Sequence, residues 1–191
     1  MPQSRRYKKK KSAGKAILAW IIVLAILAAA VFVFVSVFYE DTKKKLDEMN
    51  YPRTYSTYVE KAAKDYDLDP ALIYAVIHTE SGFDPKAESG VGAKGVMQMM
   101  PSSFEWLQEQ RGCAGQYTED DLFDPEICID YGSYLLKYFY DYYGTERSAI
   151  AAYNAGFVVS DWLSDTNYSS DGKNLDSIPY PETENYVDKV E

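Results

Sequence analysis

The sequence predicts a mainly α-helical protein in two parts: a single N-terminal helix that crosses a membrane, and an α-helical domain that follows it. Residues 16–39 carry no charged side chain. After residue 53, apolar side chains recur at helical spacing, with Pro and Gly at the expected helix ends. Residues 1–15 hold seven basic side chains and no acidic one, whereas the rest of the chain holds 13 basic and 29 acidic side chains, a net charge of −16. This acidity argues against a nucleic-acid partner, because phosphate binding needs Lys and Arg.

The uncharged run of residues 16–39 has the length and composition of a transmembrane anchor. As a helix it would be roughly 35 Å long, enough for a hydrocarbon core of about 30 Å. Trp20 and Tyr39 stand near its ends, where aromatic rings prefer the membrane interface. The basic tail of residues 1–15 predicts a cytoplasmic N-terminus and a domain on the other side of the membrane. The alternative is a signal peptide cleaved at the alanines of residues 28–30, but the apolar run continues well beyond them.

Residues 40–52 are rich in charge and end at a proline, so we expect a linker there and a domain over residues 53–191. A helical stripe opens this domain at Tyr55, Tyr58, Val59, Ala62 and Tyr66. The next helix, over residues 70–81, has the clearest boundaries. Asp69 is suited to cap its N-terminus, Pro70 to occupy its first position, and Gly82 to end it.

The other helices are predicted from the same boundary signals. We expect helices over residues 102–110, 125–143, 146–155 and 183–191, with a loop over 165–181 that is rich in Ser, Asp, Asn, Gly and Pro. Ser102 and Glu105 have the spacing of a capping box, which would begin the first of these helices. Asp124 and Pro125 begin the second, and a glycine follows both the second and the third.

Cys113 and Cys128 are the only cysteines in the chain. Outside the membrane a disulfide between them is allowed, and closing this short loop would stabilise the fold by about 3 kcal/mol. Two free buried thiols are the alternative. With two cysteines and the single His78, a zinc site would have too few soft ligands. We therefore expect no metal and no cofactor, and a structural role for His78.

Glu80 is the residue whose position points to chemistry. It continues a helical stripe formed by Ile73, Val76 and Ile77, and it lies in the last turn of its helix. Burial there would raise its pKa, as a general acid working near neutral pH needs. The negative end of the helix dipole would further disfavour the carboxylate. From spacing alone, the alternative is a solvated or ion-paired side chain at a frayed helix end.

Three blocks of the sequence resemble the soluble lytic transglycosylase family, bacterial cell-wall lyases related to goose-type lysozyme. Residues 80–101 read ESGFDPKAESGVGAKGVMQMMP, residues 152–156 read AYNAG, and residues 182–187 read ETENYV. They occur in the order found in the family. Together they place the resemblance over residues 53–191.

The resemblance implies a lysozyme-like α domain that cleaves the β-1,4 bond between N-acetylmuramic acid and N-acetylglucosamine in peptidoglycan. Glu80 would be the single catalytic acid and base. It would protonate the glycosidic oxygen and then take the proton of the muramoyl C6 hydroxyl, which closes a 1,6-anhydro ring in place of attack by water. Because the substrate supplies the nucleophile, the second carboxylate of most glycosidases is not required. The nearest acid, Asp84, precedes a proline and is expected to be a turn residue.

The same resemblance assigns substrate contacts to six residues: Ser89, Met97, Gln98, Tyr153, Asn154 and Tyr186. The hydroxyl of Tyr186 would lie close to Glu80. A turn hydroxyl is the alternative for Ser89, and a place in the core is the alternative for Met97. Gly92 and Gly95 would permit a tight backbone beside the cleft.

The sequence thus predicts a membrane-anchored lytic transglycosylase that acts on peptidoglycan outside the cytoplasmic membrane. Two alternatives use the same fold. One is a hydrolase of the goose-lysozyme type, which would leave a reducing end. The other is a glycan-binding or assembly protein without activity.

Overall fold

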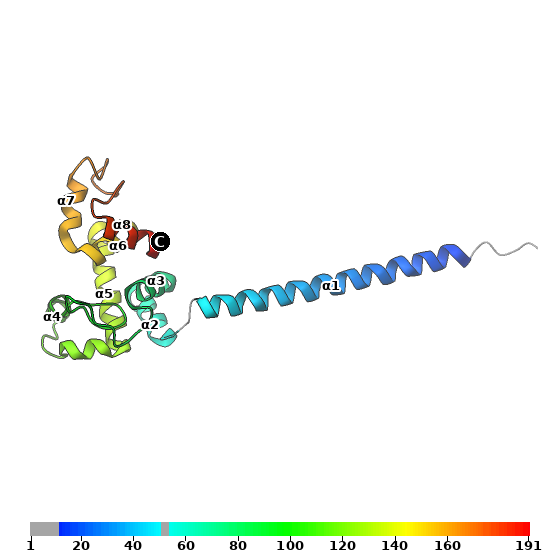
Figure 1. Ribbon diagram of the computed structural model, residues 1–191, viewed down its shortest axis with the longest axis horizontal. Helices are drawn as coiled ribbons and strands as arrows, with labels where there is room; N and C mark the ends of the chain where they lie inside the picture. Colours follow the sequence, from blue (N-terminus) through cyan, green and yellow to red (C-terminus); the bar gives the residue numbers. More distant parts are fainter. Residues whose placement is uncertain (1–11, 51–53) are drawn as a thin grey trace, which may run out of the picture. The chain divides into compact units, whose positions relative to one another are not determined.

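A computed structural model describes residues 12–50 and 54–191 (Figure 1). The chain divides into two compact units, Met1–Pro52 and Arg53–Glu191. In the described residues, regular structure consists of eight α-helices and two 3₁₀ helices, with two isolated β-bridges. The prediction of a mainly α protein is confirmed.

The first unit contains one helix, α1 (Ser12–Asn50). Its segment Ile17–Ser36 has a mean hydropathy of 3.1 and is not buried by the rest of the protein. By length and composition, this segment is able to cross a membrane. The helix continues through residues 40–50, so the expected linker is helical up to Asn50. Most of the basic tail, residues 1–11, lies outside the described residues, as do the end of the linker and the first domain residue, residues 51–53.

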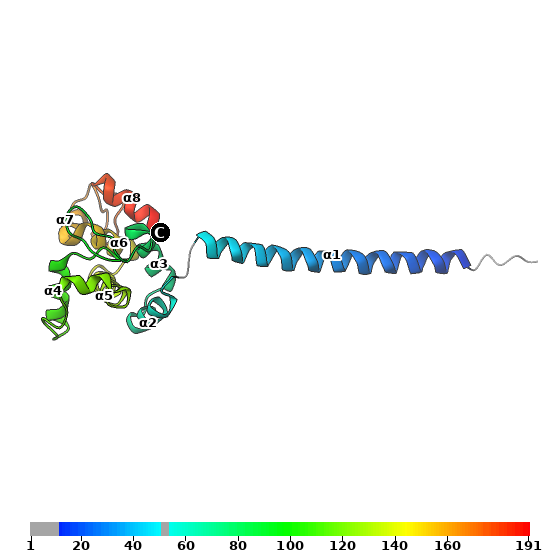
Figure 2. The same ribbon diagram turned by 60° about the horizontal axis from the view of Figure 1, so that its bottom comes forward.

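The second unit is built around the long helix α5 (Pro125–Tyr143), which contacts α2, α4 and α6 (Figure 2). Its other elements are α2 (Ser56–Tyr66), α3 (Pro70–Ser81), α4 (Pro101–Gln110), the 3₁₀ helix η1 (Glu119–Phe123), α6 (Glu146–Ala155), the 3₁₀ helix η2 (Gly156–Val158), α7 (Val159–Ser164) and α8 (Pro181–Val190). The last helix, α8, packs on α3 and α6. This packing brings the C-terminal end of the chain to the helix that carries Glu80.

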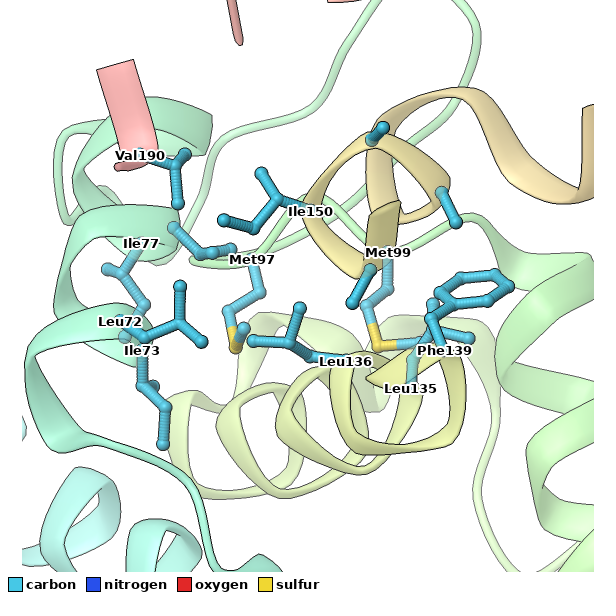
Figure 3. Packing of buried hydrophobic residues seen from close by; sticks show 14 of the residues in the cluster. Leu72, Ile73, Ile77, Met97, Met99, Leu135, Leu136, Phe139, Ile150 and Val190 are labelled. Carbon is cyan, nitrogen blue, oxygen red and sulfur yellow. The ribbon is translucent and has the colours of Figure 1, made fainter. Parts of the chain in front are cut away.

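The hydrophobic core belongs to the second unit alone. Every buried apolar side chain of the described residues lies between Val59 and Val190. Met97 and Met99 point into this core from the loop before α4, together with Ile77 of α3 (Figure 3). Because the second unit has its own core, we expect it to fold without the first.

The predicted boundaries of α3 and α5 are confirmed by their caps. The Asp69 carboxylate accepts a hydrogen bond from the N–H of Ala71 at 2.8 Å, and the Asp124 carboxylate accepts one from Glu126 at the same distance. Each satisfies a backbone donor that the first turn of a helix leaves unpaired. Gly144 ends α5 with a φ of 74°.

The capping box predicted at Ser102 is wrong. Pro101 is the first residue of α4, and Met100 before it makes no side-chain cap. A proline at this position needs no hydrogen-bond acceptor, which moves the start of the helix ahead of Ser102. A capping box is present instead at Thr118 and Asp121, where it begins η1. Neither η1 nor the η2–α7 segment was predicted.

Candidate active site

Glu80 lies at the C-terminal end of α3, on the helix face that enters the core. The apolar members of this face, Ile73, Val76 and Ile77, are fully buried, which confirms the predicted stripe. Gly82 ends the helix with a φ of 59°, a conformation that side chains rarely adopt. The Ser81 hydroxyl donates to the carbonyl oxygen of Val96 at 2.8 Å and so ties the end of α3 to the following loop. The Glu80 carboxyl is therefore held at the edge of the core.

Tyr186 of α8 is the hydrogen-bond partner of Glu80. Its hydroxyl donates to Glu80 Oε1 at 2.8 Å, although the two residues are 106 positions apart. Burial raises the pKa of Glu80 to about 7, while the bond from Tyr186 opposes this shift by stabilising the charged carboxylate. Burial and the nearby Glu80 charge raise the pKa of Tyr186, which therefore remains a proton donor. A carboxyl with a pKa of about 7 exists in both protonation states near neutral pH, as an acid and base catalyst requires.

Helix α6 brings two further predicted residues to this region. The Tyr153 hydroxyl donates to the carbonyl oxygen of Met97 at 2.9 Å. Burial, with a contribution from the charge of Glu80, raises the pKa of Tyr153, which places its hydroxyl within electrostatic reach of the carboxyl. The Thr183 hydroxyl donates to Asn154 Oδ1 at 2.8 Å. Because this bond occupies the amide oxygen, the amide NH₂ of the exposed Asn154 is left to donate.

The loop between α3 and α4 is held by hydrogen bonds of its own. Lys94 and Met99 exchange backbone hydrogen bonds of 2.9 and 3.0 Å. The amide nitrogen of Gln98 donates to the carbonyl oxygens of Ala87 and Gly95 at 3.1 and 3.0 Å. Both amide hydrogens of Gln98 are thus used within the loop. Its Oε1 remains as the acceptor that this side chain offers to a ligand.

Two predicted contact residues have interactions within the fold. Ser89 Oγ accepts a hydrogen bond from the N–H of Ala93 at 3.0 Å, as a turn hydroxyl would, and its hydroxyl hydrogen remains to donate to a ligand. Met97 is fully buried. It packs so closely against α5 that a Cβ added at Gly132 would lie 2.5 Å from its sulfur. The prediction that Met97 faces the substrate is therefore wrong, and its alternative place in the core is correct.

The two cysteines are free thiols, but only Cys128 is buried, while Cys113 is partly exposed, so the alternative of two buried thiols holds for Cys128 alone. Cys113 Sγ lies 3.3 Å from the Tyr131 hydroxyl. Cys128 Sγ accepts a hydrogen bond from the N–H of Met97 at 3.4 Å. The two side chains thus contact different parts of the fold. Burial raises the pKa of Cys128 to about 12, which keeps this thiol protonated and unreactive.

Thr183 is a site residue that the sequence analysis missed. It precedes Tyr186 by three residues on the same helix, so the two side chains share a face. Tyr186 reaches Glu80 while Thr183 reaches Asn154. The signal was present in the ETENYV block, where a threonine and a tyrosine stand at helical spacing.

Comparison with known proteins identifies the family. The model described as the transglycosylase SLT domain matches residues 57–175. The soluble lytic murein transglycosylase of Escherichia coli (strain K12) is 32% identical over 146 residues, which cover 75% of this chain and 23% of that protein. The membrane-bound lytic murein transglycosylase C of Sodalis glossinidius is 39% identical over 111 residues, covering 53% of this chain and 31% of that protein.

The solved structures agree with the sequence comparison. The 70 kDa soluble lytic transglycosylase of Escherichia coli superimposes with a TM-score of 0.66 at 29% identity, over 75% of this chain and 24% of that one. This likeness confirms the lysozyme-like α fold predicted for the second unit. The chain spans only 23% and 31% of the length of the two curated relatives. The family model nevertheless covers more than half of the chain, and the protein belongs to the transglycosylase SLT domain family.

Proposed function

We propose that this protein is a membrane-anchored peptidoglycan lytic transglycosylase. It cleaves the β-1,4 bond between N-acetylmuramic acid and N-acetylglucosamine and leaves a 1,6-anhydro-muramoyl end. The observation that carries the proposal is the Glu80 carboxyl, whose pKa is about 7 and whose Oε1 is held by Tyr186 at 2.8 Å. The family assignment supports it, and relatives named lytic murein transglycosylases support peptidoglycan as the substrate class.

The reaction has two proton transfers, both at Glu80. The protonated carboxyl first gives its proton to the glycosidic oxygen as the bond from that oxygen to the anomeric carbon breaks. The carboxylate then takes the proton of the muramoyl C6 hydroxyl, and that oxygen forms the new bond to the anomeric carbon. Glu80 ends protonated and no water is consumed. Tyr186 occupies Oε1, which leaves Oε2 for both transfers, and it stabilises the carboxylate between them.

The surroundings of Glu80 favour a reaction in which the substrate supplies the nucleophile. Glycosidases that use two carboxylates hold them about 5 to 9 Å apart. At that distance the charge of one raises the pKa of the other. Within residues 54–191, the pKa of Glu80 is shifted by burial and by Tyr186, without a contribution from another carboxylate. Such a site is compatible with the formation of a 1,6-anhydro product, in which the C6 hydroxyl of the substrate is the nucleophile.

Two amides, Gln98 in the loop before α4 and Asn154 on α6, would complement the acetamido group of the sugars. The Thr183 hydroxyl occupies Oδ1 of Asn154, so the NH₂ group of Asn154 is the part of this side chain that would donate to the acetamido oxygen. Gln98 has its oxygen free to accept from the acetamido N–H, because its NH₂ is bound to the loop. Ser89 still has its hydroxyl hydrogen to donate to a sugar oxygen. These groups would orient the sugar rather than transfer protons.

The anchor would hold the domain at the outer face of the cytoplasmic membrane. Ile17–Ser36 is long enough to span the bilayer, and the seven basic residues within 1–15 favour a cytoplasmic N-terminus. Relatives named membrane-bound lytic murein transglycosylases support attachment to a membrane. Protease added to intact spheroplasts should digest the catalytic unit. Full protection of that unit would overturn the orientation.

Mass analysis of products from purified peptidoglycan tests the reaction. We expect residues 40–191 to release muramoyl products that lack one water relative to a reducing sugar. Reducing ends would instead identify a hydrolase of the goose-lysozyme type, and binding without cleavage would identify a glycan-binding protein. The matched control is Glu80→Gln, which keeps an acceptor for Tyr186 and should bind strands without cleaving them.

A further inference from the structure

Four aromatic side chains from three elements form a cluster at the surface of the second unit. We call Trp106 of α4, Tyr138 and Tyr142 of α5, and Phe157 of η2 the aromatic platform. The ring of Phe157 lies 6.4 Å from Trp106, 6.2 Å from Tyr138 and 5.8 Å from Tyr142, each at nearly a right angle. Phe157 remains 49% exposed and Tyr142 59% exposed. Aromatic side chains left in water in such a cluster indicate a binding surface.

The platform continues from the candidate active site along two segments of the chain. Phe157 follows Asn154 by three residues, and η2 begins directly after α6. Gly156 turns the chain between them with a φ of 75° and a ψ of −154°, and three residues of chain span at most roughly 10 Å. Trp106 lies on α4, which begins directly after the loop that contains Gln98. A polymer bound at Asn154 and Gln98 would therefore reach the platform within a few sugar units.

We propose that the aromatic platform is an extended subsite on which the glycan strand lies beyond the bond that is cleaved. This inference rests on the proposed function. The faces of aromatic rings carry partial negative charge. The C–H bonds on the face of a pyranose ring are polarised positively and stack against them. The exposed hydroxyl of Tyr142 adds a hydrogen-bonding group at the edge of such a sugar.

Size and charge argue for a glycan over other occupants. A stable interface between proteins buries about 800 Å² on each partner, more than two half-exposed rings and two partly buried ones supply. An anionic membrane surface would be repelled by the part of the chain after residue 15, whose net charge is −16. Beside the platform, the charge of Asp141 is paired with Lys137 at 2.7 Å. An uncharged sugar face needs no cationic contact.

Binding of defined glycan strands tests the platform. The full chain carrying Glu80→Gln, reconstituted in nanodiscs, would be titrated with strands of two and of six disaccharide units. Tyr142→Ala and Phe157→Ala should each weaken binding of the longer strand about tenfold and leave binding of the shorter strand unchanged. Phe157→Trp, which keeps an aromatic face, should restore binding. The matched control is Tyr140→Ala, which removes an exposed tyrosine of the same helix that lies beside Lys137.

The other outcomes overturn the platform. If the Tyr142→Ala and Phe157→Ala variants bound the longer strand as tightly as their parent, the rings would not contact it. If both variants lost the same affinity for the shorter and the longer strand, the rings would only support the cleft. A change in self-association or in binding to anionic nanodiscs, with strand binding intact, would assign the surface to a different occupant. The proposed function fails separately: it fails if the chain with Glu80 intact cleaves neither strand, an outcome that does not depend on the platform.

Discussion

Replacing Glu80 by Gln should stabilise the second unit, and the gain should grow as the pH rises. Burial holds the pKa of this carboxyl at about 7, above its ordinary value of 4.5. Between these two pH values the folded protein keeps a proton that the unfolded chain has released. The free energy of unfolding therefore falls with rising pH over this range in the wild type. Gln carries no charge at any pH, so the variant escapes this loss.

The size of the effect follows from the pKa difference. Raising the pKa from 4.5 to about 7 corresponds to about 3 kcal/mol of free energy. The two proteins should differ least near pH 4, and the variant should gain about 3 kcal/mol by pH 7 or slightly above. At higher pH the gain should stay constant, because Glu80 is then ionised in both states. Tyr186 can still donate to the Gln oxygen, so its hydrogen bond is kept in the comparison.

Urea unfolding of residues 54–191 at pH 4, 5.5, 7 and 8 measures this difference. All other titrating groups are shared by the two proteins, so the change in the difference with pH reports on Glu80. Glu105→Gln is the matched control, because it removes an exposed carboxylate of α4 and should change the free energy of unfolding little at any of these pH values. A Glu80→Gln difference that stays constant from pH 4 to 8 would refute the reasoning, since it would mean that burial does not raise the pKa of Glu80.

Three further predictions concern the site and its supports. Tyr186→Phe removes the bond that favours the charged form of Glu80. The decline of kcat/KM with rising pH should therefore move to higher pH, with kcat lower by roughly 10- to 100-fold; an unchanged pH profile would contradict this role. Gly95→Ala should destabilise the fold by roughly 3 kcal/mol in urea unfolding, because the added Cβ would lie 2.0 Å from the Leu122 carbonyl oxygen at a φ of 76°; near-wild-type stability would refute the close approach. Because both cysteines are free, dithiothreitol should leave Tm unchanged, whereas a fall of roughly 10 °C would reveal a disulfide.

The helix boundaries were predictable where one local signal acted alone. Asp69 and Asp124 each precede a proline, and both cap a helix as expected. At α4 two signals competed. The spacing of Ser102 and Glu105 suggested a capping box, but Pro101 takes the first helical position, and the helix starts there. Sequence spacing could not decide between the capping box and the proline start, because both signals fit a helix that begins within residues 101–103.

The position of Glu80 on the buried face of its helix was predictable, because it continues a periodic apolar stripe. The burial of side chains in the loop between α3 and α4 was not predictable. Val96, Met97 and Met99 are all buried, so this segment has no alternation that would separate a core side chain from one facing the cleft. The burial of Met97 depends on Gly132 of α5, which makes room for its sulfur. Such a contact between distant segments cannot be recognised from the spacing of apolar residues within either segment.

The C-terminal helix affects the pKa of Glu80 in two opposing ways. Helix α8 has only ten residues, too few for a stable helix in isolation, so it forms as it packs on α3 and α6. Docking of Tyr186 helps to bury the carboxyl, which raises its pKa, and places a donor on Oε1, which lowers it. In the proposed mechanism, burial without the donor would favour the protonated form of Glu80, which cannot accept the proton of the C6 hydroxyl. The donor without burial would favour the ionised carboxylate, which cannot give the proton that the proposed mechanism delivers to the glycosidic oxygen. One helix therefore contributes to a Glu80 pKa of about 7, near which both proposed proton transfers are possible.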